Sequence, residues 1–323
     1  MNPQPLVFVS GTLPGNSVEQ LFGCFNVVRG ESGIRSAEFA ACRERVEALV
    51  ALVTDRIDEA LLATLPRLRI VANVAVGVDN IDLAACARRG IVVTNTPDVL
   101  TEATADLAFG LLLSAARRIA EGDRLMRAGG FSGWTPTFML GTRVHGMTLG
   151  ILGLGRIGQA VARRARGFGM HVLYTQRTRL SEEMERALGA AFVPALDEML
   201  ARADAVSIHC PLTQETRHLF SRERLARMKP GSVLVNTARG PIVDEAALAD
   251  ALAKGPLAAA GLDVYEEEPR VHPALLTREN VVLAPHIGSA DRASREAMAG
   301  MAIANVMRFL SGEPPVSQVT MGR

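Results

Sequence analysis

The side chains of this chain that are suited to acid–base chemistry follow three successive apolar runs. Arg239 follows the run 232–236, Asp263 and Glu266–Glu268 follow the run that begins at 259, and His286 follows the run 281–285. Each run is typical of a buried strand, and open α/β sheets bind ligands beyond the carboxyl ends of their parallel strands. A guanidinium, a carboxylate and an imidazole are therefore expected to meet at one edge of a sheet.

This set of groups suits the transfer of a hydride to a ketone. The ketone oxygen needs a proton, which His286 can supply, and a glutamate bonded to the other ring nitrogen keeps the imidazole charged and oriented. Arg239 can hold a substrate carboxylate in a bidentate fork and polarise the adjacent carbonyl. Taken singly, each of these residues is typical of a structural or surface position. Their occurrence together, after three successive runs, favours a catalytic site. Spacing alone does not select one of the three glutamates.

A glycine-rich segment lies upstream of these runs. It has the spacing G-x-G-x-x-G, follows an apolar run and opens a helical pattern, which is the context of a dinucleotide-binding loop. The first glycine permits a tight turn, the second leaves room for a pyrophosphate, and the third lets the helix pack closely on its strand. Asp263 is expected to contact the nicotinamide side of the cofactor. The predicted cofactor-binding residues of the loop are Gly153, Gly155, Arg156, Ile157 and Gly158.

The end of the next apolar run bears on the choice of cofactor. An NAD site places an Asp or Glu there, about 20 residues past the glycines, to bind the ribose 2′-hydroxyl. Here Gln176 occupies that place, followed by Arg177 and Thr178. A neutral amide beside a guanidinium accepts a 2′-phosphate that a carboxylate would repel. The sequence thus predicts NADPH in preference to NADH, with Arg177 and Thr178 binding the 2′-phosphate. The alternative is that Arg177 is an ordinary surface arginine in contact with solvent and has no role in binding the cofactor.

Apolar runs alternate with helical patterns through most of the chain, which predicts an α/β protein with parallel sheets. A second series of runs begins at Thr148, after a continuous helix expected over 101–128. The last helix, within 291–313, is expected to return to the first series. We therefore predict two doubly wound parallel-sheet domains, Rossmann- or flavodoxin-like, the second inserted in the first. The substrate domain comprises 1–98 plus 288–323, and the dinucleotide-binding domain comprises 99–287.

Composition excludes several classes of function. Lys plus Arg number 35 and Asp plus Glu 34, so no net field draws the chain to nucleic acid or to a membrane surface. The four cysteines have no metal-ligand spacing, which favours free thiols in a reducing compartment and no metal site. The N-terminal stretch lacks the features of a signal peptide, and the longest apolar run, 107–116, is too short for a bilayer. A cytoplasmic protein is expected, with neither nucleic acid nor membrane as partner.

Four segments carry a resemblance to a known family. They are GLGRIGQAVARR (153–164), NTARGPIVDEAAL (236–248), GLDVYEEEP (261–269) and PHIGSA (285–290). Together they resemble the D-isomer-specific 2-hydroxyacid dehydrogenases, and the similarity covers nearly the whole chain. The segments VGVDNIDL, TPDVLTEATADLAFGLLL and YTQRTR make the glyoxylate and hydroxypyruvate reductases the most similar subgroup.

The resemblance implies an oxidoreductase that reduces a small 2-oxo acid to the D-2-hydroxy acid, with His286 as general acid. It implies Arg239, Glu268 and His286 as the catalytic set and so selects Glu268, next to Pro269, among the glutamates. It also implies that backbone groups of Val76 and Gly77 bind the substrate carboxylate, with Arg239 and His286 completing the substrate site.

The resemblance further implies a homodimer built around the second domain. Trp134 and Phe138 would then pack near the partner's active site; the competing expectation is core packing within one subunit. Two other functions remain open from the sequence. One is a 2-ketogluconate reductase or another 2-oxo-acid reductase, and the other is a dinucleotide-sensing binding protein similar to a corepressor.

Overall fold

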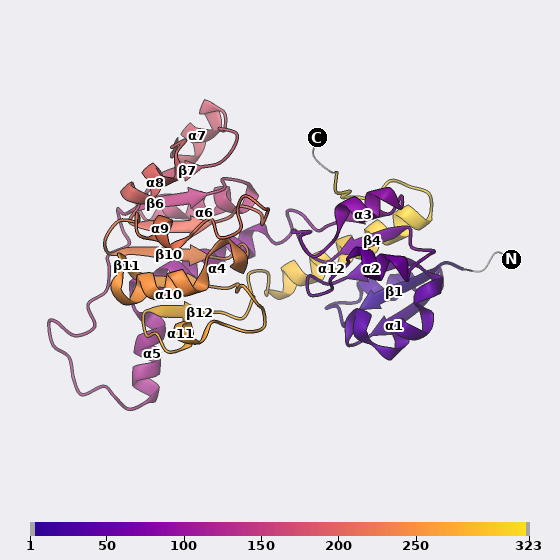
Figure 1. Cartoon of the computed structure of the whole chain (residues 1–323), viewed down its shortest axis with the longest axis horizontal. Coiled ribbons are helices and arrows are strands. Elements are labelled where there is room, and N and C mark those ends of the chain that lie inside the picture. Colours follow the sequence, from indigo (N-terminus) through magenta and orange to yellow (C-terminus); the bar gives the residue numbers. More distant parts are fainter. Residues whose placement is uncertain (1–3, 321–323) are drawn as a thin grey trace. The chain divides into compact units, whose positions relative to one another are not determined.

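The structure, a computed structural model, describes residues 4–320 and divides into two compact units (Figure 1). Unit 1 comprises Met1–Leu100 and Ser289–Arg323, and unit 2 comprises Thr101–Gly288. The limits predicted from the sequence, after 98 and after 287, lie two residues and one residue from these limits. Unit 2 is thus a continuous segment inserted into a discontinuous unit 1.

Unit 1 contains a parallel sheet of five strands in the order β2-β1-β3-β4-β5. This order is that of flavodoxin-like folds, as predicted. The central strands β1 and β4 are fully buried, as their apolar sequences require, whereas β2 at the edge is mostly exposed or half-buried and had no apolar signal. The strands are β1 (Leu6–Ser10), β2 (Asn26–Gly30), β3 (Val46–Ala51), β4 (Ile70–Asn73) and β5 (Val92–Thr94).

Helices cover both faces of the unit 1 sheet. On one face, Ile303 and Val306 of the C-terminal helix α12 pack against Val7 and Ile70, so the last helix completes the core begun by the first strand. On the other face lie the short helices α1, α2 and α3. The helices are α1 (Ala37–Cys42), α2 (Glu59–Ala63), α3 (Leu83–Arg88) and α12 (Arg292–Leu310), with 3-10 turns η1 (Ser17–Leu21), η2 (Gly33–Arg35) and η3 (Arg43–Arg45).

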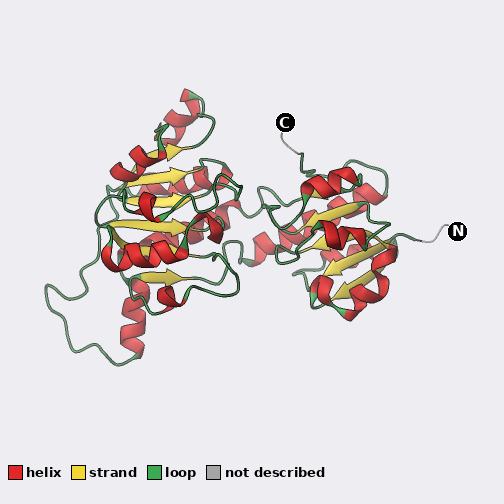
Figure 2. Cartoon of the chain, viewed as in Figure 1, coloured by secondary structure: helices red, strands yellow, loops and turns green. Residues whose placement is uncertain are grey.

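Unit 2 contains a parallel sheet of seven strands in the order β12-β11-β10-β9-β6-β7-β8 (Figure 2). Strand order reverses between β6 and β9, as in the Rossmann fold, and such a switch point is where ligands bind. The two predicted parallel-sheet domains are thereby confirmed. The strands are β6 (Thr148–Leu152), β7 (His171–Thr175), β8 (Ala190–Phe192), β9 (Ala205–Ile208), β10 (Ser232–Asn236), β11 (Leu257–Leu262) and β12 (Val281–Leu283).

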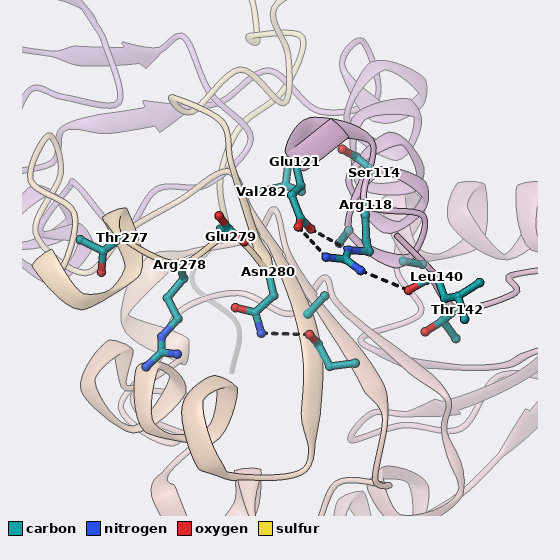
Figure 3. Close-up of a pocket in the computed structure, with 15 residues that line it drawn as sticks. Ser114, Arg118, Glu121, Leu140, Thr142, Thr277, Arg278, Glu279, Asn280 and Val282 are labelled. Carbon is teal, nitrogen blue, oxygen red and sulfur yellow. Dashed lines mark hydrogen bonds and ion pairs between the residues drawn. The ribbon is translucent and has the colours of Figure 1, made fainter. Parts of the chain in front are cut away.

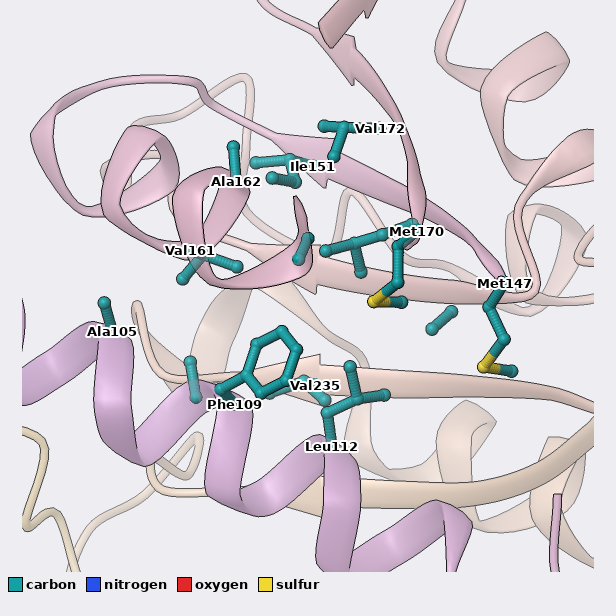
Figure 4. Close-up of a cluster of buried hydrophobic side chains, with 14 of the residues drawn as sticks. Ala105, Phe109, Leu112, Met147, Ile151, Val161, Ala162, Met170, Val172 and Val235 are labelled. Atoms are coloured by element: carbon teal, nitrogen blue, oxygen red, sulfur yellow. The ribbon is translucent and has the colours of Figure 1, made fainter. Parts of the chain in front are cut away.

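Two hydrophobic cores lie on the two faces of the unit 2 sheet. Figure 4 shows one of them, where Phe109 and Leu112 of α4 face Ile151 of β6 and Val235 of β10. Helices α8 and α10 bury Met199, Leu248 and their neighbours on the other face. The helices are α4 (Thr101–Ala116), α5 (Ile119–Arg127), α6 (Arg156–Gly167), α7 (Glu182–Leu188), α8 (Leu196–Arg202), α9 (Arg222–Leu225), α10 (Glu245–Lys254) and α11 (Pro273–Leu276), with the 3-10 turn η4 (Gly240–Ile242).

The continuous helix predicted over 101–128 is wrong, because the helix breaks after Ala116. The Ala116 carbonyl accepts a hydrogen bond from the Thr142 amide (2.7 Å). In a continuous helix this carbonyl would instead accept the amide of the residue four positions further along the chain. Arg118 is left-handed (φ 56°) and its guanidinium is bonded to Glu121 in the first turn of α5. Within residues 4–320, no helix is long and apolar enough to cross a membrane.

The segment that follows the break projects from unit 2. Figure 1 shows α5 and the loop after it extending away from the sheet. The Trp134 side chain is 78% exposed, so the expectation of core packing within one subunit is wrong for this residue. Phe138 is 37% exposed, and its ring lies 5.8 Å from that of Phe131.

Candidate active site

The glycine loop joins β6 to α6 at the carboxyl edge of the unit 2 sheet. Gly153 is left-handed (φ 89°), and a Cβ there would lie 2.9 Å from the Cys210 amide nitrogen. A Cβ at Gly158 would lie 2.3 Å from the Gly153 carbonyl oxygen, so helix and loop approach as closely as backbone allows. The first and third glycines of the motif are therefore required by the local fold.

The second glycine of the motif faces open space. Gly155 is the N-cap of α6, supplies no capping side chain, and has no atom within 4 Å of the place where a Cβ would stand. The first turn of α6 carries no acidic residue. Amides at a helix N-terminus with no competing carboxylate suit a phosphate group. The residues present thus fit the pyrophosphate of a dinucleotide, with Arg156 and Ile157 following directly in that turn.

Gln176, at the end of β7, is engaged by the protein. Its Oε1 accepts a hydrogen bond from the Leu154 amide of the glycine loop (2.9 Å), and its Nε2 donates to the Thr178 carbonyl (2.6 Å). Arg177 is exposed, and its charge contributes to lowering the pKa of Glu215, after hydrogen bonds to that carboxylate from Thr213 and its own backbone. Gln176 therefore holds the loop, and Arg177 is the cation presented beside it.

A network around the buried side chains of Tyr174 and Glu185 fixes the loop that carries Arg177. The Tyr174 hydroxyl donates to Glu185 (2.6 Å) and accepts from the Leu180 amide (2.9 Å). Arg179 binds both oxygens of Glu185, each at 2.8 Å. Hydrogen bonds from Arg179 and Tyr174 lower the pKa of Glu185 to about 2 against the opposing effect of burial. The second arginine of the segment is thus structural, and sequence analysis gave neither Tyr174 nor Glu185 a role.

At the other end of the same sheet edge, the structure brings Glu268 and His286 together. The Nδ1 of His286 lies 2.8 Å from Glu268 Oε2, and each side chain is 34% exposed. Glu268 Oε1 accepts the Tyr265 amide (3.1 Å). Burial raises the pKa of Glu268, but the hydrogen bond and charge of His286, the Tyr265 amide and the charge of Arg239 outweigh it, so the pKa is lowered. An ionised Glu268 therefore faces the imidazole.

Asp263 holds the segment of His286. The Asp263 carbonyl accepts the His286 amide (2.8 Å), and its two carboxylate oxygens accept the amides of Ile287 (2.7 Å) and Gly288 (2.8 Å). The side chain is buried, and burial raises its pKa against these hydrogen bonds and the charge of His286. His286 itself is left-handed (φ 52°), a conformation that side chains rarely adopt. From the sequence, Asp263 was expected only to contact the cofactor. The structure shows that it also binds the backbone amides of the segment that carries His286.

Arg239 follows β10 and is half-buried. Its carbonyl accepts a hydrogen bond from the Asn236 side chain (2.9 Å), which closes a turn at the strand end. The next residue, Gly240, packs against the backbone of Tyr265 so closely that a Cβ would lie 1.8 Å from the Tyr265 carbonyl carbon. The segments that carry Arg239 and Glu268 are therefore in backbone contact, and only glycine fits between them.

One polar group at this edge has no partner among the described residues. The Oγ1 of Thr237 is buried, and no hydrogen bond satisfies it. Thr237 lies between β10 and Arg239, at the carboxyl edge where Rossmann folds bind dinucleotides. An unsatisfied buried hydroxyl is costly, and a bound polar ligand would satisfy it. This observation is a second sign that the edge fits a cofactor.

Val76 and Gly77, predicted to contact the substrate, lie in unit 1 after β4. Their carbonyl oxygens accept hydrogen bonds from Asn95 (2.9 Å) and Asn73 (2.9 Å). The Asn73 side chain is in turn bonded to Asn80 (3.2 Å). Side-chain amides thus fix the peptide planes of this turn.

One cavity of unit 2 lies away from this edge. It has a volume of about 460 Å³ and is lined by Arg118, Glu121, Leu140 and Asn280, near the amino ends of β11 and β12 (Figure 3). Open parallel sheets bind ligands at the carboxyl edge, so position argues against this cavity as the reaction site. Among residues 4–320, no group of three or more His, Cys, Asp or Glu side chains is placed to hold a metal ion.

Comparisons with known proteins agree with this geometry. Residues 109–288 match the family described as D-isomer specific 2-hydroxyacid dehydrogenase, NAD binding domain. A glyoxylate reductase of Thermococcus onnurineus (strain NA1) is 48% identical over 322 residues, 98% of this chain and 96% of that protein. A crystal structure of a glyoxylate reductase from Paecilomyes thermophila has a TM-score of 0.88 at 35% identity, with 99% of each chain covered.

A further solved structure includes ligands. It is an NADPH-dependent glyoxylate/hydroxypyruvate reductase from Sinorhizobium meliloti in complex with NADP and malonate. Its TM-score is 0.87 at 37% identity, and the match covers 98% of this chain and 97% of that chain. Likeness at this level, over both units, extends beyond the dinucleotide-binding fold alone.

Proposed function

The chain belongs to the D-isomer-specific 2-hydroxyacid dehydrogenase family, and on this premise we propose that it is a glyoxylate/hydroxypyruvate reductase. It reduces the small 2-oxo acid to the D-2-hydroxy acid. The observation that carries the proposal is the hydrogen bond between Glu268 and His286, placed at the same sheet edge as the glycine loop. The relatives named above are glyoxylate reductases, so the 2-ketogluconate and corepressor-like alternatives gain no support from them.

His286 acts as the general acid. Its Nδ1 faces the ionised Glu268, so Nε2 is the nitrogen that gives a proton to the carbonyl oxygen of the substrate. Glu268 stabilises the charged imidazole before transfer and fixes its plane. A reduced nicotinamide, when bound, supplies the hydride. In the reverse direction, neutral His286 accepts the proton of the hydroxy acid.

Arg239 binds the substrate carboxylate and polarises the adjacent carbonyl, for which its planar guanidinium is suited. Its charge already acts on Glu268, which places the two groups within electrostatic range. Backbone groups of Val76 and Gly77 are proposed as further partners of the carboxylate, in a turn that Asn73 and Asn95 hold rigid.

The glycine loop and Asp263 are proposed to bind the cofactor, with NADPH preferred over NADH. Support comes from the ribose edge, where Gln176 is engaged by Leu154 and Thr178 and the residues that follow β7, 176–179, include no carboxylate. Arg177, with Thr178, then binds a 2′-phosphate through charge-assisted hydrogen bonds. The NADPH-dependent relative with its bound NADP has a similar fold, which supports the same choice.

A homodimer is proposed as the working form. The projecting segment 119–140 holds six of the large apolar side chains that are exposed in this chain, a density that monomeric surfaces rarely carry. We place Trp134 and Phe138 of this segment against the second subunit. A cytoplasmic location remains a prediction, supported by the four cysteines, all of which are free. The exposed side chains of the segment are Ile119, Met126, Phe131, Trp134, Phe138 and Leu140.

A substrate and cofactor panel tests the proposal. Glyoxylate, hydroxypyruvate and 2-ketogluconate are each measured with NADPH and with NADH. We expect turnover of the first two acids and a higher kcat/KM for NADPH. Turnover of 2-ketogluconate alone would replace the proposed substrate, and a preference for NADH would overturn the role of Arg177. Absence of turnover with every acid would refute the function.

A further inference from the structure

One buried carboxylate holds both ends of the loop that carries Glu268. Glu245 is the first residue of α10 and is 5% exposed. Its Oε1 accepts the Glu266 amide (2.8 Å), and its Oε2 accepts the His272 amide (3.0 Å). Glu268 lies between these two amides. A single side chain therefore fixes where this loop begins and where it ends.

The contact with Glu266 is reciprocal. The Glu245 amide donates to Glu266 Oε2 (2.9 Å), so each residue binds the backbone of the other. Glu266 Oε1 is bonded to the His218 ring, and the His218 amide donates to the Pro241 carbonyl (2.8 Å). Pro241 stands two residues after Arg239. The loop after β11 is thus joined to the segment after β10.

The usual roles of a glutamate at a helix start do not account for Glu245. Asp244 is the N-cap of α10, and its Oδ1 accepts the Ala247 amide (2.8 Å). A first-turn acid can serve the helix dipole from the surface without any hydrogen bond, whereas a buried carboxylate must be hydrogen-bonded to be tolerated. The hydrogen bonds of the Glu245 side chain go to the Glu268 loop.

We infer that Glu245 is a positioning residue for proton transfer, because it holds the loop 266–272 so that Glu268 stays in hydrogen-bond reach of His286. The inference rests on the proposed function for its kinetic consequences. Glu268 Oε2 lies 2.8 Å from His286 Nδ1, and its other oxygen is held by the Tyr265 amide. A shift of about 1 Å in such a contact is enough to lower a rate about a hundredfold.

The variant Glu245→Gln tests the inference. A side-chain amide keeps the shape but turns an NH2 group toward one of the two backbone donors, so one end of the loop is released. We expect kcat to fall about tenfold to a hundredfold, while KM for the 2-oxo acid and for NADPH changes less than about threefold. The pH at which reduction is half-maximal moves down, because the imidazolium loses its partner. An unchanged kcat in a folded variant refutes the inference.

Glu267→Gln is the matched control. It also removes one negative charge, from the loop that Glu245 holds, but Glu267 is 70% exposed and pairs with Arg270 on the surface. Its kcat and pH profile are expected to equal those of the wild type. A loss as large as that of Glu245→Gln would show that charge alone matters and would overturn the positioning role.

A double-variant cycle separates positioning from general stabilisation. Once Glu268→Gln has removed the negative charge beside His286 and one of the two acceptor oxygens, the additional change Glu245→Gln is expected to cost little more. If the reductions in kcat of the two single variants multiplied in the double variant, Glu245 would act independently of Glu268, which would contradict the inference. Thermal unfolding identifies a variant that does not fold. Glu266→Gln then takes its place, because it weakens the reciprocal contacts of the Glu266 carboxylate with the Glu245 amide and with His218, and a smaller effect in the same direction is expected.

A spectroscopic readout tests the geometry without turnover. A hydrogen-bonded Nδ1 proton of His286 gives a downfield proton NMR signal, assigned by its loss in His286→Gln. We expect the signal to persist in Glu267→Gln and to shift upfield or vanish in Glu245→Gln. If the wild type reduces no 2-oxo acid but this pattern holds, the proposed function fails and the positioning role stands. If the signal is unchanged in Glu245→Gln, the positioning role fails whatever the activity.

Discussion

The two ends of the unit 2 sheet edge are held in different ways. Around β10–β12, buried carboxylates accept backbone amides, as Asp263 does from Ile287 and Gly288. Around the end of β7, one carboxylate is held by side chains, with Glu185 bonded to Tyr174 and Arg179. Backbone contacts fix atoms without depending on a counter-charge. The difference suggests that the reacting end is built for fixed geometry and the ribose end for recognition by charge.

The largest expected effect tests the reacting end. His286→Gln removes the proposed general acid, a role that contributes about 10²–10⁴-fold, so kcat for reduction is expected to fall by about that factor. In the wild type, we expect reduction, which needs the proposed proton donor, to slow as pH rises, and we expect oxidation of the hydroxy acid to show the opposite limb. Stopped-flow rates across pH check both statements. Binding of NADPH, followed by fluorescence, is expected to remain.

His171→Gln is the control for that measurement. His171 is exposed at the start of β7, at the other edge of the sheet. Its substitution is expected to leave the rate of reduction and the pH profile unchanged. A pH limb that survives in His286→Gln would contradict the assignment of the acid. The comparison of the two sheet ends would then lose its chemical basis.

The sequence predicted the features that arise locally. Apolar runs ending in polar residues located β10, β11 and β12, and the glycine spacing located the β6–α6 turn, because parallel strands put their carboxyl ends together. The edge strands β2 and β8 gave no such signal. β2 reads Asn-Val-Val-Arg-Gly and β8 is only three residues long, so neither has a run of apolar residues that stands out.

Features that depend on distant contacts were not predictable in this way. The break after Ala116 is fixed by Thr142, far along the chain, while the local pattern continues to favour helix. Glu245 follows an N-capping aspartate and so looks like an ordinary first-turn acid; its partners at Glu266 and His272 are visible only in three dimensions. The choice of Glu268 among three glutamates likewise needed the resemblance, and the structure pairs it with His286.

The next effect in size tests recognition by charge at the ribose end. Arg177→Gln removes the proposed partner of a 2′-phosphate, and charge-assisted hydrogen bonds contribute about 1.5–3 kcal/mol. We expect kcat/KM for NADPH to fall about tenfold to a hundredfold and that for NADH to stay the same. Steady-state kinetics with both cofactors measure the ratio.

Arg186→Gln is the matched control for Arg177. Arg186 lies on α7, is 73% exposed and pairs with Glu182, so its removal changes the net charge without touching the end of β7. Its cofactor preference is expected to equal that of the wild type. If kcat/KM fell equally with NADPH and NADH in Arg177→Gln, this arginine would not be a binding partner of the 2′-phosphate.

The smallest effect concerns how the ribose end is stabilised. The pKa of Glu185 is lowered from 4.5 to about 2 by Arg179 and Tyr174, so the unfolded chain takes up this proton at a higher pH than the folded chain does. The contribution of Glu185 is fully present above the ordinary carboxyl value and is lost as pH falls toward about 2. Urea unfolding of the wild type and Glu185→Gln is therefore expected to show a gap at neutral pH that closes in acid.

Because the Arg179 side chain is 55% exposed, salt is expected to narrow that gap at neutral pH, whereas the backbone-held end responds little to salt. Glu182→Gln, an exposed neighbour on α7, serves as the control and is expected to leave stability nearly unchanged. A gap that stays constant from neutral pH to acid would show that Glu185 contributes through packing rather than charge. The two sheet ends would then differ only in which groups bind their carboxylates, and not in whether charge stabilises them.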